Sequence, residues 1–248
     1  MGQLTGRIAL VTGGSRGIGR GIAERLARDG AQVIVHYGSN EAAAKETVAA
    51  IDAGGGTAFA LRAELGVPGD ADTVLDGLRE HGVDRLDVLV NNAGILIPGE
   101  FAETTAADFD RQIAINVKAP FFLIQRLLPL IPDGGRIINI SSVLTRIAGS
   151  SLTYALSKGA VDVLSHTLAK HLGPRGITVN TVHPGIVPTD INADLLADEN
   201  YAAQARQRVA LGRFGEPADI ADAVAFLASH DSRWITGSKI DTTGGTAL

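Results

Sequence analysis

The chain of 248 residues contains no cysteine, and its charge balance is not basic. Without thiols there can be no disulfide, thiolate nucleophile, iron–sulfur cluster or cysteine-ligated zinc. A net charge of −5 argues against a surface that binds nucleic acid or an anionic membrane. The six histidines lack the spacing of a ligand set, so we expect no metal site.

Long hydrophobic runs are also missing. No stretch of about 18 uncharged apolar residues occurs, so we expect no membrane-spanning helix. Residues 1–6 lack the basic and apolar regions of a signal peptide. With 45% apolar and 20% charged residues, the composition is that of a folded globular chain. We therefore expect a soluble, cytoplasmic protein that binds neither membranes nor nucleic acid.

Short β-branched apolar runs alternate with helical segments along the chain. The runs at 86–90 and 136–140 are nearly continuous, which is typical of strands covered on both faces. We expect strands at 7–11, 32–36, 57–61, 86–90, 136–140, 178–182 and 239–242. We expect helices near 17–29, 41–53, 70–81, 105–130, 154–172 and 217–229. This alternation predicts an α/β fold with a doubly wound sheet.

One segment, at about residues 188–214, breaks this alternation with charged residues among short apolar runs. Its place after the sixth expected strand favours a substrate lid, and the alternative is a surface loop without a role. No repeat, low-complexity tract or linker divides the chain. Residues 1–248 are therefore expected to form a single domain.

The first expected strand ends in a glycine-rich turn at 12–19, with the spacing TGxxxGxG. Glycines allow a tight turn and let backbone N–H groups approach a pyrophosphate at the next helix's N-terminus. The same letters match the GxSxG nucleophile elbow of hydrolases. That motif needs earlier strands and an oxyanion loop, and only 14 residues precede Ser15. The turn therefore favours a dinucleotide site.

The residues at the end of the second expected strand distinguish an NAD site from an NADP site. An NAD site places an acidic residue there for the ribose 2′-hydroxyl. Residues 36–40 contain no carboxylate, and the first one follows at Glu41. Arg16, in the glycine turn, can instead pair with a 2′-phosphate. We expect NADP(H) to be preferred, with NAD(H) possible.

The strongest local chemistry lies in Tyr154 and Lys158, which share one face of an expected helix. A nearby ammonium favours the phenolate and lowers a pKa that starts at about 10. The pair would then form a proton donor that works near neutral pH. Ser142, at the end of the fifth expected strand, could offer a hydroxyl to the same substrate oxygen.

Weaker features gain meaning only in this context. Residues 91–94 close the fourth expected strand and would border the same crevice. Asn116 lies inside an expected helix, where asparagine is a poor helix former, so a local role is plausible. Pro184 and Gly185 follow the sixth strand near this crevice. For His183, we expect a structural role, and the alternative is a contact with substrate.

Together these residues resemble the classical short-chain dehydrogenase/reductase family over nearly the whole chain. The motifs that carry the resemblance are 12–19, 91–94, Asn116, Ser142, 154–158, 184–189, 235–237 and 244–245. The resemblance implies a single Rossmann-type domain with a seven-stranded parallel sheet, helices on both faces and no separate substrate domain.

The resemblance also implies a catalytic tetrad of Asn116, Ser142, Tyr154 and Lys158. Tyr154 would exchange a proton with the substrate oxygen, and Ser142 would hydrogen-bond that oxygen. Lys158 would lower the Tyr154 pKa and hold the nicotinamide ribose. Asn116 would support a water that relays protons to Lys158.

Cofactor contacts are expected from the glycine turn, the ends of the second, third and fourth strands, the tyrosine and lysine, and the segment after the sixth strand. They are Gly13, Ser15, Arg16, Gly17, Ile18, Gly19, Tyr37, Ser39, Asn40, Glu64, Leu65, Asn92, Ala93, Gly94, Tyr154, Lys158, Pro184, Gly185, Val187 and Thr189. Glu64 stands where the family usually has an aspartate beside the adenine.

Residues 143–147 and 96–97 indicate a partly apolar pocket for a small carbonyl or alcohol substrate. Our first interpretation is a ketone or 3-oxoacyl reductase, because the chain resembles 3-oxoacyl-carrier-protein reductases. The enzyme alternative is a sugar or polyol dehydrogenase. The other alternative is a nucleotide-binding regulator, which would need no serine–tyrosine–lysine set. Surplus apolar residues on the helices near 105–130 and 154–172 predict a homo-oligomer, and the resemblance makes it a tetramer.

Overall fold

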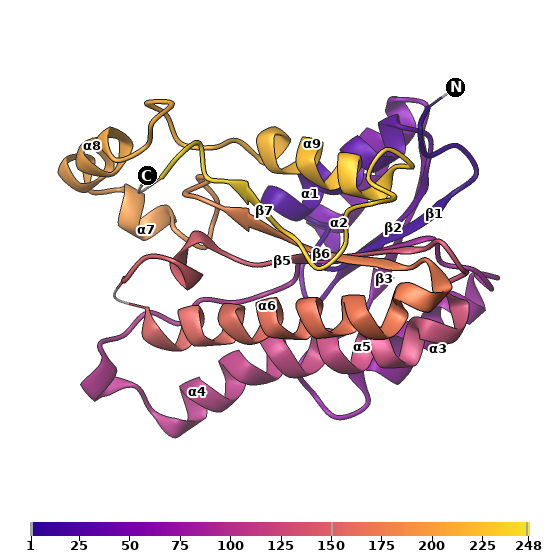
Figure 1. The fold of residues 1–248 in the computed structure, drawn as a ribbon, viewed down its shortest axis with the longest axis horizontal. Helices are drawn as coiled ribbons and strands as arrows, with labels where there is room; N and C mark the ends of the chain where they lie inside the picture. The colour runs from indigo at the N-terminus through magenta and orange to yellow at the C-terminus, as the bar shows by residue number, and fades with distance from the viewer. Residues whose placement is uncertain (1, 150, 247) are drawn as a thin grey trace.

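The computed structural model describes residues 2–149, 151–246 and 248. Its strands form one parallel seven-stranded sheet in the order β3-β2-β1-β4-β5-β6-β7 (Figure 1). They are β1 Ile8–Val11, β2 Gln32–Tyr37, β3 Thr57–Arg62, β4 Val88–Asn91, β5 Arg136–Ile140, β6 Thr178–Pro184 and β7 Lys239–Thr242. The expected sheet is confirmed, and no end of a strand differs from its expected place by more than two residues.

Helices cover both faces of the sheet (Figure 1). One layer holds α1 Gly17–Arg28, α2 Glu41–Ala53 and α9 Pro217–Ala228, and the other holds α3 Asp70–Glu80, α4 Ala106–Ile113, α5 Ala119–Leu127 and α6 Leu152–Leu172. Successive strand side chains enter opposite cores: Val33 and Val35 pack under the first layer, and Ile34 packs under the second. Both faces of the sheet are buried, which is why the sequences of these strands are continuous apolar runs.

The helix expected over 105–130 is interrupted. Between α4 and α5 lies a π-helical turn, Ala114–Lys118, and α5 ends in a 3₁₀ turn, Leu128–Leu130. By length and composition alone, Ala106–Leu130 could cross a membrane. In this fold it is a layer helix, because Leu123, Ile124 and Leu127 are buried in the core that it shares with α3.

The strand order reverses between β1 and β4, so the loops after these strands diverge and leave a crevice at the carboxyl ends. The segment after β6 lies at this end of the sheet (Figure 1) and contains α7 Ala193–Leu196 and α8 Glu199–Gln207. Phe214 packs with Ala202 and Ala205 in a small cluster of its own. The segment expected at 188–214 is therefore held by its own contacts beside the crevice.

Candidate active site

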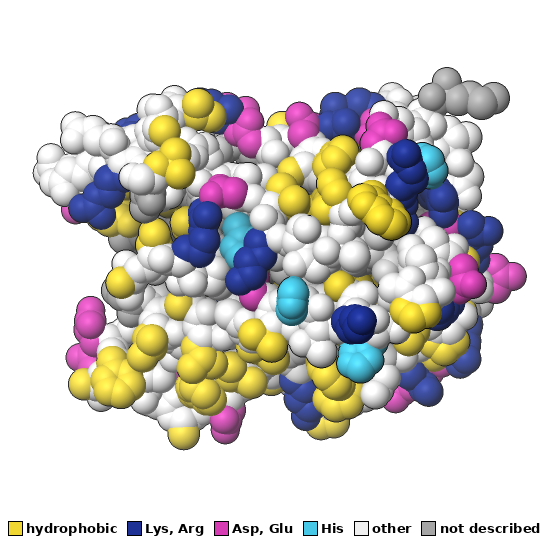
Figure 2. Space-filling model, in the orientation of Figure 1, with side chains coloured by type: hydrophobic (Ala, Val, Ile, Leu, Met, Phe, Trp, Pro, Cys, Tyr) yellow, Lys and Arg dark blue, Asp and Glu magenta, His cyan; other side chains and the backbone are white. Residues whose placement is uncertain are grey.

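A pocket of about 680 Å³ runs along the carboxyl ends of the strands. Figure 2 shows the molecule hollowed between the α7–α8 segment and the layer of α4 and α6. Every expected cofactor contact lines this pocket, and so do Ser142, Tyr154 and Lys158. Asn116 does not line it. Lining residues that the sequence analysis missed include His36, Arg62, Tyr201, Gln204 and Arg208.

The glycine turn needs its glycines for two reasons. Gly13 has a φ of 63°, in the left-handed region, and a Cβ there would come within 3.1 Å of the Ala93 Cα atom. A Cβ on Gly19 would lie 2.1 Å from the Gly13 carbonyl oxygen. The turn therefore packs directly against the loop after β4 and against the start of α1. No acidic side chain occupies the first turn of α1, which leaves the helix N-terminus suited to an anion.

The loops after β1 and β4 are bonded to each other. Thr12 Oγ1 accepts from the backbone N–H groups of Asn92 and Ala93, both at 3.0 Å. The Asn92 amide donates in return to the carbonyls of Thr12 and Gly13, at 2.9 and 3.1 Å. These bonds fix the two sides of the crevice relative to each other.

His36, at the end of β2, supports the same turn from below. Its Nδ1 accepts from the Gly13 N–H at 3.2 Å, and its Nε2 lies 3.0 Å from the Ala63 carbonyl oxygen. Burial lowers the pKa of His36 to about 4, so the ring is neutral and donates from Nε2. The sequence contains no signal for this role, because the contact spans two strands.

Charged groups lie around the part of the pocket that Arg16 and Arg62 line. Arg16 pairs with Asp190, with Nη1 2.6 Å from Oδ2, and both side chains are exposed. Arg62 has no ion-pair partner among the residues that the structure describes. Glu41 lies 2.8 Å from Lys45, and this hydrogen bond lowers the Glu41 pKa. The Asn40 side chain caps α2 by accepting from the Ala43 N–H at 3.0 Å.

Ser142 and Tyr154 both line the pocket, and the Ser142 hydroxyl acts to lower the pKa of the Tyr154 phenol. Ser142 lies two residues after the end of β5, and its Oγ accepts from the Leu144 N–H at 3.2 Å. Tyr154 and Lys158 lie one turn apart on α6, with Lys158 Nζ 5.6 Å from the centre of the tyrosine ring. The Lys158 ammonium donates to the Ile140 carbonyl at 2.8 Å. Ser142, Tyr154 and Lys158 thus meet at one wall of the pocket.

The electrostatics correct one expectation. Burial raises the pKa of Tyr154 to about 12, and the Ser142 hydroxyl opposes this only in part. Burial also lowers the pKa of Lys158 to about 8, against the charge of Asp162. The expected lowering of the tyrosine pKa by Lys158 is wrong for this structure, because desolvation of the phenol dominates and Lys158 Nζ lies over the ring, 5.6 Å from its centre. The phenol is therefore protonated at neutral pH.

Asn116 is buried in the π-helical turn. Its Oδ1 accepts from the Ile95 N–H at 2.9 Å, and its Nδ2 donates to the Ile95 carbonyl at 2.8 Å and to Ser157 Oγ at 3.0 Å. A Cβ on Gly94 would lie 3.2 Å from Asn116 Oδ1 and 3.3 Å from Lys158 Nζ. Asn116 therefore shapes the loop after β4, and its role in a proton relay stays a prediction.

The chain is similar to known proteins over almost its full length. Residues 13–247 match the protein family described as enoyl-(acyl carrier protein) reductase. The chain is 36% identical to a versicolorin reductase of Emericella nidulans over 98% of this chain and 96% of that protein.

Two solved structures are also similar over almost their full length. One is the angucycline C-6 ketoreductase LanV with bound NADP, with a TM-score of 0.94, 51% identity, and 99% of this chain and 97% of that chain covered. The other is LugOII, a promiscuous reductase that catalyses keto-reduction at C1 during lugdunomycin biosynthesis, with a TM-score of 0.93, 52% identity, and coverage of 99% and 100%.

Proposed function

The chain belongs to the short-chain dehydrogenase/reductase family of oxidoreductases, and on this premise we propose that it uses NADPH to reduce a ketone on a fused-ring aromatic molecule. The observation that carries the proposal is the meeting of Ser142, Tyr154 and Lys158 at the wall of the large pocket. Two hydroxyls that meet there can both donate to a single oxygen. This favours reduction of a carbonyl group over reduction of a carbon–carbon double bond.

The residues around the crevice fit a dinucleotide. Gly13 and Gly17 both have positive φ, and the N-terminus of α1 carries no competing carboxylate. A pyrophosphate would lie against the backbone N–H groups of this turn. When bound, NADPH supplies the hydride for the substrate carbon. The protein's own contribution is to orient both partners and to provide the proton.

Tyr154 acts as the general acid in this proposal. Its phenol is protonated at neutral pH because burial raises its pKa to about 12. As hydride reaches the carbon, negative charge develops on the oxygen, and a donor already in place there lowers the barrier. Ser142 donates a second hydrogen bond to the oxygen. The charge of Lys158 stabilises the phenolate that remains after proton transfer.

Three features support NADPH over NADH. No carboxylate stands at residues 36–40, and Glu41 is engaged with Lys45. Arg16 and Arg62 both line the pocket, as residues 36–40 do, and they carry the positive charge that a 2′-phosphate requires. The homologous LanV structure contains NADP.

The substrate class follows from the other end of the pocket. Apolar side chains of Leu96, Leu144 and Ile147 line it. On α8 and just after it, Tyr201, Gln204 and Arg208 line the same pocket at a spacing that places them on one helix face. We infer that 188–214 forms a substrate lid and that a flat apolar ring system with polar substituents fills the space below it. The similarity to an angucycline ketoreductase supports this choice.

The test is a panel of substrates followed by the absorbance of reduced nicotinamide. Fused-ring aromatic ketones, 3-oxoacyl thioesters and simple ketones are offered with NADPH or NADH, and sugars and polyols are offered with the oxidised cofactors. We expect the highest kcat/KM with a fused-ring ketone and NADPH. A higher value with 3-oxoacyl thioesters would reassign the substrate to our first interpretation, and turnover only with sugars or polyols would reject ketone reduction.

A further inference from the structure

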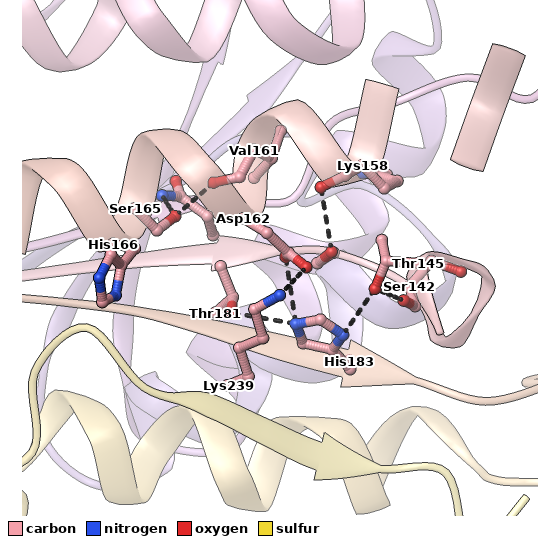
Figure 3. A network of polar contacts seen from close by, with 12 residues as sticks. Ser142, Thr145, Lys158, Val161, Asp162, Ser165, His166, Thr181, His183 and Lys239 are labelled. Carbon is pink, nitrogen blue, oxygen red and sulfur yellow. Dashed lines mark hydrogen bonds and ion pairs between the residues drawn. The ribbon is translucent and has the colours of Figure 1, made fainter. Parts of the chain in front are cut away.

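Two buried ionisable side chains behind the active site take no part in the proposed reaction. Asp162 on α6 and His183 on β6 are 4% and 1% exposed, and Asp162 Oδ1 lies 3.1 Å from His183 Nε2. Lys239 on β7 provides a second cation, with its Nζ 2.8 Å from Asp162 Oδ2. Figure 3 shows the imidazole of His183 lying between Asp162 on one side and Thr145 on the other. His183 does not line the pocket.

The contacts continue from His183 to Ser142. Nε2 of His183 faces both Asp162 Oδ1 and Thr181 Oγ1 at 3.1 Å, and Nδ1 on the other side of the ring faces Thr145. Nδ1 lies 3.4 Å from Thr145 Oγ1, and the Thr145 hydroxyl donates to the Ser142 carbonyl at 3.1 Å. Burial raises the Asp162 pKa, but the close contacts of its carboxylate with His183 and Lys239 outweigh it and hold the value at about 2. The carboxylate that orients the ring is therefore charged at neutral pH.

Asp162 also faces the catalytic lysine. It lies one turn after Lys158 on α6, and its charge raises the Lys158 pKa against the effect of burial. The ionisable groups that face Asp162 are His183 from β6, Lys239 from β7 and Lys158 from its own helix, and Ser141 after β5 adds a hydroxyl. One carboxylate thus contacts His183 and Lys239 directly and acts on Lys158 through its charge.

We propose that Asp162 and His183 are positioning residues: through Thr145 they hold the turn that carries Ser142, and the Asp162 carboxylate, one helical turn from Lys158, stabilises the Lys158 ammonium. The inference rests on the proposed function, since that function gives Ser142 and Lys158 their roles. Neither Asp162 nor His183 lines the pocket. They act by fixing where the Ser142 hydroxyl stands and how long Lys158 stays charged as the pH rises.

The first experiment tests the link through Thr145. Thr145→Val removes the hydroxyl and keeps the shape of the side chain, whereas Thr145→Ser keeps the hydroxyl. We expect kcat for ketone reduction to fall about tenfold in the valine variant, with the KM for NADPH unchanged, and to recover in the serine variant. Equal kcat values in the two variants would overturn the link.

The second experiment tests the electrostatic effect. In wild type, kcat/KM should fall above about pH 8, as Lys158 loses its proton. Asp162→Asn should move this alkaline limb to lower pH by about half a unit or more, because the ammonium loses its nearest negative charge. The matched control is Asp87→Asn, a fully buried carboxylate that also pairs with two cations, Arg7 and Arg85, and lies just before β4 at the amino-terminal end of the sheet. It should lower the free energy of unfolding without moving the limb.

An alkaline limb that stays in place in Asp162→Asn, or that moves equally in both aspartate variants, would overturn the inference. If Asp162→Asn does not fold, the two Thr145 variants still decide. If wild type reduces the ketone and none of these variants differs from it, the inference about Asp162 and His183 is refuted and the proposed function stands. A wild type that reduces no ketone refutes the proposed function together with it.

Discussion

The imidazole of His36 accepts a hydrogen bond from the backbone N–H of Gly13, 23 residues earlier in the chain, at 3.2 Å. Through its other nitrogen the ring contacts the Ala63 carbonyl at 3.0 Å. One neutral side chain therefore joins the turn after β1 to the end of β3. A protonated ring could no longer accept from Gly13, so the geometry of the proposed cofactor turn depends on the ionisation of His36.

His36 should make the protein sensitive to mild acid. Its pKa is about 4 in the folded protein, against an ordinary value of 6.5, so the unfolded chain binds more protons between these two values. The free energy of unfolding should therefore fall as the pH drops from about 6.5 toward about 4, by about 3 kcal/mol in total. Above about pH 6.5 this contribution is fully present.

His36→Asn is the variant that isolates this effect, because asparagine can still accept from Gly13 and does not titrate. Urea unfolding of both proteins at about pH 7 and about pH 4.5 gives the comparison. The free energy of unfolding should decrease less between these two pH values in the variant than in wild type. The difference should be most of the about 3 kcal/mol that the buried histidine contributes. An equal loss in both proteins would contradict the prediction.

Tyr154→Phe should remove most turnover and leave cofactor binding nearly intact. Only the hydroxyl is lost while the ring still packs, so the cost falls on the transition state. General acid catalysis is worth about 10²- to 10⁴-fold, and kcat should fall in that range. NADPH affinity, measured by fluorescence titration, is the control. A variant that keeps more than about a tenth of wild-type kcat would remove Tyr154 from the acid role.

Arg16 should set the preference for NADPH. A hydrogen bond to a charged group contributes about 1.5–3 kcal/mol, so wild type should favour NADPH in kcat/KM by about ten- to a hundredfold. Arg16→Ala should lower this ratio. Asp190→Asn should not lower it, because Asp190 competes with the phosphate for the same guanidinium. If Arg16→Ala leaves the ratio unchanged, Arg62 becomes the residue to examine.

The protein should be a homotetramer. Apolar side chains gather on the outer surface of α4, α5 and α6, where Figure 2 shows them over α4 and α6. Phe121, Phe122, Leu156 and Val163 are between 41% and 68% exposed, more apolar surface than a lone chain would be expected to leave in water. Light scattering at micromolar concentration should give a mass near four chains, and Val163→Glu should reduce it. A monomeric wild type would contradict the prediction.

Local sequence determined the elements and most of the pocket. The apolar strands have both faces covered, and the glycine turn needs positive φ at Gly13, so each is encoded in neighbouring residues. Parallel topology then brings the carboxyl ends of all strands to one edge, and this alone explains why residues expected from seven separate motifs line one pocket. The periodicity of one helix was enough to predict that Tyr154 and Lys158 share a face.

Tertiary structure decided what depends on contacts between distant segments and on the loss of water. Arg16 and Asp190 are 174 residues apart, and no local pattern pairs them. The π-helical turn contains Asn116, whose side chain bonds to Ile95 and Ser157 from other segments, and the unbroken helix expected near 105–130 is wrong at this point. The raised Tyr154 pKa likewise reflects burial, whereas the i, i+4 spacing alone indicated the opposite shift. Sequence periodicity fixes which face a side chain takes, but only the packed fold fixes its partners and its exposure to water.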